Sequence, residues 1–91
     1  MGIAEACLGL ACLAADAGEW HRAAVLHGAA QAALDQTGQP WQYLEARYRQ
    51  DSLGQVRAHL GPEQSGRANA EGMALSLDEA LDLASRKAGP A

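Results

Sequence analysis

The sequence predicts an all-α protein, and two observations support this prediction. Alanine, the residue with the highest helix propensity, supplies 21 of the 91 residues. β-Branched residues are scarce, and no stretch alternates apolar and polar residues as a half-buried strand does. We expect about five antiparallel helices in a single domain over residues 1–88, followed by a tail or the start of a linker at residues 89–91.

The first predicted helix, within residues 2–18, is apolar almost all round. A helix of this kind is usually buried on every side, so we expect neighbours around it. Gly18 suits a left-handed cap at its C-terminal end.

The second predicted helix, within residues 19–38, has an apolar stripe at helical spacing. The stripe contains Trp20, Ala23, Ala24, His27, Ala30 and Leu34. Gly28 stands in the middle of this helix, where glycine costs about 1 kcal/mol relative to alanine. One interpretation is that a neighbouring helix passes too close at Gly28 for a side chain.

The third predicted helix, within residues 41–61, is amphipathic. One face contains Trp41, Leu44, Tyr48, Val56 and Leu60. Glu45 and Arg49 have the spacing of an exposed ion pair. Gly61 ends this helix, and Pro62 suits the first position of a short fourth helix that reaches about Met73.

The last predicted helix begins at Ser76, and Glu79 follows three residues later. This spacing is that of a capping box, in which each residue bonds the other's backbone N–H. We expect Leu77, Leu81 and Ala84 to cover the apolar side of the helices before it.

The charge and the apolar pattern disfavour several classes of partner. The net charge is −4 and the basic residues are scattered, which argues against direct binding of nucleic acid by this segment. No apolar run approaches the ~20 residues of a membrane span. The apolar start lacks the basic residues of a secretory leader, so a reducing cytoplasm is the expected location.

No residue pattern predicts a catalytic, cofactor or metal site. The candidate metal ligands form neither a CxxC nor an HExxH pair; they are Cys7, Cys12, His21, His27 and His59. Cys12 and His27 could meet across a helical hairpin as a nucleophile and its base. A chance meeting of two packed helices would place them together equally well, so we expect no enzyme activity.

Small residues lie where the first two predicted helices would cross: Ala11 and Ala14 in the first, and Ala23 and Ala30 with His27 in the second. With this spacing the two helices resemble a tetratricopeptide hairpin. Two further blocks are the alanine-rich stretch from Ala23 to Ala30 and the ending from Ala70 to Ala84. Through them, nearly the whole chain resembles the C-terminal part of the helical-repeat region of large bacterial ATPase regulators of the LuxR and AfsR/SARP kind.

The resemblance implies a non-catalytic segment of a transcriptional regulator that serves as a protein-interaction scaffold. Neither a Walker motif nor a helix-turn-helix signature is present, so ATP hydrolysis and DNA binding are not implied. The alternative function is the sensing of a small effector in a groove between hairpins. Trp20, Trp41 and Tyr48 are the candidate groove residues.

An apolar first helix at the end of a helical array predicts self-association. We expect a homodimer through the N-terminal hairpin. Its candidate face contains Ile3, Cys7, Leu8, Leu10 and Cys12. The rival expectation is a monomer in which the other helices enclose the first one.

Overall fold

The computed structural model describes residues 3–76, 78–79 and 82–83. Four helices are described in full, and no strand occurs within these ranges. They are α1 (Ile3–Asp16), α2 (Trp20–Thr37), α3 (Tyr43–Leu60) and α4 (Pro62–Met73). The all-α prediction is therefore confirmed, whereas the predicted count of five helices is not. No helix in the described part of the chain is long and apolar enough to cross a bilayer.

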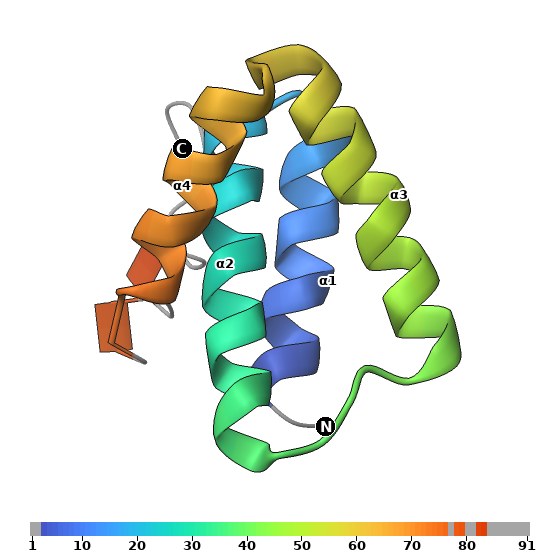
Figure 1. Ribbon diagram of the computed structural model, residues 1–91, viewed down its shortest axis with the longest axis vertical. Helices are drawn as coiled ribbons and strands as arrows, with labels where there is room; N and C mark the ends of the chain where they lie inside the picture. Colours follow the sequence, from blue (N-terminus) through green and yellow to red (C-terminus); the bar gives the residue numbers. More distant parts are fainter. Residues whose placement is uncertain (1–2, 77, 80–81, 84–91) are drawn as a thin grey trace.

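The four helices form two successive hairpins (Figure 1). Helix α2 lies between α1 and α4, and α3 packs against α1 and α2 and approaches α4 at its C-terminal end. Helices α1 and α3 run in the same direction, because each is the first helix of its hairpin. The side of α1 and α3 that α2 does not cover therefore faces outward.

Glycine ends both α1 and α2, as the sequence predicts for α1. Gly18 and Gly38 have φ values of 79° and 72°, in the left-handed region that favours glycine. The Gly18 N–H donates to the Ala15 carbonyl at 3.0 Å, so an otherwise free carbonyl of α1 gains a partner.

Alanine makes up most of the interface between α1 and α2. Ala11, Ala23 and Ala24 are fully enclosed, and Leu26 and Val56 supply larger side chains to the same cluster. Small side chains let the two helix backbones approach closely. The core therefore consists of closely packed helices with few large apolar side chains between them. The stripe predicted on α2 is buried from Ala23 to Leu34, and Trp20 is half-buried.

Two glycines let α2 and α4 touch backbone to backbone. A Cβ atom at Gly28 would collide with the Asn69 carbonyl oxygen and lie 3.0 Å from the Met73 nitrogen. A Cβ atom at Gly72 would collide in the same way with the Val25 carbonyl oxygen. The close approach predicted at Gly28 is therefore confirmed, and Gly72 is its counterpart on α4.

The face predicted for the third helix is buried only in part. Val56 is buried and Leu60 packs against the main cluster, as predicted, whereas Leu44 and Tyr48 are not covered. Trp41 precedes α3, whose first turn is capped by Gln42: the Gln42 N–H donates to the Glu45 carboxylate at 3.1 Å. Leu44 and Tyr48 are 61% and 62% exposed. The buried residues of α3 are Ser52 and Val56, and the Ser52 Oγ lies 2.8 Å from His27 Nε2 on α2.

The segment after α4 packs on the same core. Leu75 and Leu83 contact the main cluster, and an Arg22 guanidinium nitrogen donates to the Leu83 carbonyl at 2.8 Å. The predicted capping box is confirmed: the Ser76 N–H donates to Glu79, and the Glu79 N–H donates to the Ser76 hydroxyl at 3.1 Å.

Most of the predicted fifth helix lies outside the described residues. Its expected apolar stripe of Leu77, Leu81 and Ala84 belongs to that part, as do the end of the domain at residue 88 and the tail at 89–91.

Candidate functional site

A groove runs along the outward side of α1 and α3. It encloses about 450 Å³. The residues of α1 that line it are Glu5, Leu8, Gly9, Cys12, Ala15 and Asp16. The residues of α3 that line it are Glu45, Tyr48, Asp51, Ser52 and Gln55. We call this surface the α1–α3 groove.

A second hollow of about 580 Å³ adjoins the groove at the N-terminal ends of both helices. Glu5 and Glu45 line both spaces, so the two share these residues at their common end. The linker between α2 and α3, which includes Gln39 and Pro40, also lines the second hollow.

Three polar side chains lead from the floor of the groove into the core. Cys12 is half-buried on the floor and bonds to the Ser52 hydroxyl. Behind Ser52 lies His27, which is fully buried on α2, and its Nε2 is 2.8 Å from the Ser52 Oγ. The other ring nitrogen of His27, Nδ1, is buried and has no hydrogen-bond partner among the residues that the structure describes. Ser52 therefore links the groove to a buried imidazole.

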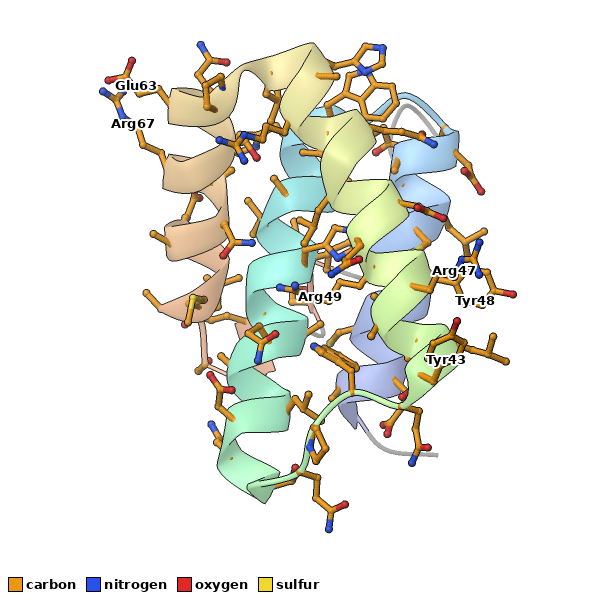
Figure 2. All side chains as sticks on the ribbon, turned by 45° about the vertical axis from the view of Figure 1, so that its right-hand side comes forward. Tyr43, Arg47, Tyr48, Arg49, Glu63 and Arg67 are labelled. Atoms are coloured by element: carbon orange, nitrogen blue, oxygen red, sulfur yellow. The ribbon has the colours of Figure 1, made fainter. Side chains whose placement is uncertain are left out.

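Burial lowers the pKa of His27 to about 4, and the nearby Arg49 guanidinium contributes to the shift. The imidazole is therefore neutral at pH 7. Arg49 is itself half-buried: its guanidinium lies 5.9 Å from the centre of the Trp41 ring, and burial lowers its pKa. Figure 2 shows Arg49 pointing toward α2, away from the groove.

The Ser52 Oγ and the His27 Nε2 are as close as a catalytic nucleophile and its general base. The described residues around them do not supply the other groups of such a catalytic site. No group orients the imidazole through Nδ1. A pKa near 4 makes His27 a weak base. The backbone N–H groups beside Cys12 and Ser52 lie inside helices, where they bond to carbonyls of the same helix and offer no oxyanion hole.

The Cys12 thiol stays protonated at neutral pH. Burial raises its pKa most, Asp16 raises it further, and the hydrogen bond with Ser52 opposes both effects. A protonated thiol is a weak nucleophile and a poor metal ligand. Within the described ranges, no three Cys, His, Asp or Glu side chains gather as a metal site would require. The polar row is best explained as a structural link between α1, α2 and α3.

The groove is acidic at its edges and apolar on its floor. Its lining includes the carboxylates of Glu5, Asp16, Glu45 and Asp51, and within the described ranges no Lys or Arg lines it. Leu8, Cys12 and Ala15 form the floor. Tyr48 stands on the α3 side, and Figure 2 shows Tyr43, Arg47 and Tyr48 projecting outward from one side of α3.

The residues predicted to form a self-association face lie in different surroundings. Cys7 and Leu8 are 1% and 5% exposed, because the chain's own helices cover them. Leu10 is half-buried against the main core, and Cys12 lies on the groove floor. The side chain of Ile3 is outside the described part. A dimer contact through Cys7 would require α1 to separate from its neighbours.

The three aromatic residues predicted to share a groove lie in three separate surroundings. Trp20 stacks on His59 near the C-terminal end of α3, with ring centres 3.8 Å apart. Trp41 lies near the other end of α2, where its indole N–H donates to the Gln31 side chain at 2.9 Å. Of the three, Tyr48 lines the α1–α3 groove.

Sequence reasoning missed Ser52 and the four groove carboxylates. The α3 residues that line the groove, Glu45, Tyr48, Ser52 and Gln55, recur at helical spacing. That spacing was visible, but its meaning depends on which helix lies beside α3. Comparison with known proteins adds nothing to the assignment: no family model, curated protein or solved structure matches the chain.

Proposed function

We propose that this chain is a non-catalytic protein-interaction module and that the α1–α3 groove is its binding surface. The observation that carries the proposal is an open groove whose floor is apolar and whose surroundings include large exposed apolar side chains. Tyr48 is 62% exposed at the groove, and Leu13, one turn from Gly9 on α1, is 64% exposed. Exposed aromatic and aliphatic groups beside a concavity are typical of protein-binding surfaces.

The packing of the helices supports a tetratricopeptide-like arrangement. The first helices of the two hairpins, α1 and α3, lie side by side and run in the same direction (Figure 1). The second helices, α2 and α4, meet closely at Gly28 and Gly72. Stacked helical repeats of this kind use the surface formed by successive repeats to bind partners. The α1–α3 groove occupies that position.

We further propose that the module belongs to a bacterial regulator of the LuxR or AfsR/SARP kind and acts in the cytoplasm. This proposal rests on the sequence blocks Ala23 to Ala30 and Ala70 to Ala84. An in-frame ATPase upstream or a helix-turn-helix downstream in the genomic reading frame would support it. A reading frame that encodes neither would contradict it.

A groove-specific selection of peptides tests the interaction function. Peptides that bind the native chain are selected from a displayed library. Their affinity is then measured for the doubly substituted Leu13→Ser, Tyr48→Ala chain. Both side chains are exposed, so we expect the variant to fold. Met73→Ser on α4 is the matched control, because Met73 is also exposed and lies away from the groove.

We expect selected peptides to bind the control variant normally and to lose at least about fivefold in affinity for the groove variant, which corresponds to ~1 kcal/mol. If every selected peptide binds both variants equally, the groove is not the binding surface and the proposal is wrong.

The second candidate function is the sensing of a small effector. The cavity volumes of about 450 and 580 Å³ favour it, since they lie in the range of small-molecule sites. A thermal-shift screen against metabolites separates the two functions. A metabolite that raises the unfolding temperature of the native chain, but not that of the Tyr48→Ala variant, would support the sensor.

A further inference from the structure

We propose that the α1–α3 groove binds a cationic amphipathic helix of another protein. This inference rests on the proposed interaction function and adds the chemistry of the partner. Its basis is the combination of an apolar floor with carboxylates at both ends and on both sides of the groove.

The positions of the carboxylates define the charge of the partner. Glu5 and Glu45 lie at the end of the groove that adjoins the second hollow, and Asp16 and Asp51 lie farther along α1 and α3. Arg47 projects from the outer side of α3 (Figure 2) and offsets one of these four charges. The net field is negative, so lysine or arginine side chains are favoured at the rim.

The floor of the groove defines the shape of the partner. Leu8, Cys12 and Ala15 recur at helical spacing on α1, and Gly9 beside them leaves open space above its backbone. From Glu5 to Asp16 the groove follows α1 for about 16 Å, or about three helical turns. A helix of matching length can lay one apolar stripe along this floor and direct its basic residues to both rims.

Charge argues against other occupants of the groove. A second copy of the chain that used the same face in a two-fold dimer would bring carboxylates opposite carboxylates. Nucleic acid and anionic lipid carry the same sign of charge as the rim and would be repelled. A basic helical segment satisfies both the charge and the shape.

Three synthetic peptides of about 14 residues, enough for a helix of about 20 Å, provide the test. In the first, leucine recurs at helical spacing and lysine fills the remaining positions. In the second, glutamate replaces every lysine. The third has the composition of the first in an order that lacks helical periodicity. Binding is measured by fluorescence anisotropy at two salt concentrations, and the binding site is mapped by amide chemical shifts.

We expect the first peptide to bind in the groove, to bind more weakly at high salt, and to exceed both others in affinity. The doubly substituted Asp16→Asn, Asp51→Asn chain should bind it about fivefold more weakly. The matched control, Glu63→Gln with Glu71→Gln, removes the same charge from α4 and should bind normally. Arg47→Ala should strengthen binding, because it removes the opposing charge.

Each other outcome overturns the inference. Groove binding by the glutamate peptide, or equal binding by all three, refutes a cationic partner but leaves the interaction function standing. If the groove variant and the α4 variant bind the first peptide equally weakly, the affinity depends on the net charge of the chain alone. Absence of groove binding by every peptide contradicts both this inference and the proposed function.

Discussion

His27 is the residue whose chemistry the fold changes most. It is fully buried on α2, and one of its ring nitrogens bonds Ser52 while the other has no partner. A polar atom buried without a partner costs free energy, which the surrounding contacts must offset. The charged imidazolium would cost more still, so the fold holds His27 in its neutral form. Protonation of His27 therefore opposes folding.

The free energy of unfolding should fall in acid because of His27. Its pKa is about 4 in the folded chain and ~6.5 when unfolded, so between these values the unfolded chain binds more protons. The contribution of His27 to stability is complete above pH ~6.5 and is lost as the pH falls toward 4, by about 3 kcal/mol.

Two measurements check this prediction. The imidazole resonances of His27 followed by NMR should titrate near pH 4. Urea unfolding at a series of pH values should show a steeper loss of stability in the native chain than in the His27→Gln variant. A titration of His27 near the ordinary histidine value would contradict the buried environment.

At the scale of the elements, the crossing of α2 and α4 depends on glycine. Gly28 and Gly72 each face the backbone of the other helix, so neither position has room for a methyl group. The exposed glycines Gly54 on α3 and Gly66 on α4 have open space where a side chain would be. These two kinds of helical glycine should respond to the same substitution in opposite ways.

Gly28→Ala should lower the free energy of unfolding by about 1–3 kcal/mol, because α4 must move away from α2. Gly66→Ala should raise it by about 0.5–1 kcal/mol, because alanine is the better helix former and meets no obstacle. Urea or thermal unfolding monitored by circular dichroism gives both values. A Gly28→Ala variant as stable as the Gly66→Ala variant would disprove the close crossing.

The helical segment after Ser76 depends on its capping box. The Ser76→Ala variant loses the hydrogen bond that the Glu79 N–H donates to the Ser76 hydroxyl and should be destabilised by about 1 kcal/mol. The Ser76 backbone N–H, and to a smaller extent its hydroxyl, lower the pKa of the Glu79 carboxyl, so loss of the hydroxyl should move the Glu79 titration upward only in part. Chemical denaturation and NMR titration measure the two effects, and a variant as stable as the native chain would contradict the role of the Ser76 hydroxyl.

At the scale of the whole molecule, the burial of Cys7 and Leu8 changes the expected oligomeric state. The covered side of α1 is occupied by the chain's own helices, and its open side forms the acidic groove. We therefore expect the chain to be a monomer, which is the alternative to the homodimer given in the sequence analysis.

Light scattering behind gel filtration should give the monomer mass of 9.5 kDa across a wide concentration range. A dimer that the Leu13→Ser substitution dissociates would show instead that the open side of α1 pairs with itself. A dimer unaffected by this substitution would place the contact elsewhere.

Local features of the fold were readable from the sequence because they depend on neighbouring residues. The alanine content and the lack of alternation determined the helical class. Gly18 and Pro62 marked helix ends, and Ser76 with Glu79 marked a cap. Even the close approach at Gly28 could be inferred, since a mid-helix glycine needs a reason beyond helix propensity.

The rotation of α3 was decided by tertiary structure alone. Helical spacing allows several apolar stripes on this helix, and the largest side chains favoured the one with Leu44 and Tyr48. In the folded chain the Ser52–Val56 side faces inward, where Ser52 contacts His27, while Leu44 and Tyr48 stay exposed although they share the predicted stripe with Val56. Tyr48 lines the α1–α3 groove as a result.

The sequence by itself thus determined which segments are helices and how several of them begin and end, because hydrogen bonds and backbone preferences act over a few residues. Only the tertiary structure decided that α1 lies beside α3, that Cys12, Ser52 and His27 form one row, and that four carboxylates surround one groove. These relations join residues far apart in the chain, and they follow from packing that no single helix specifies.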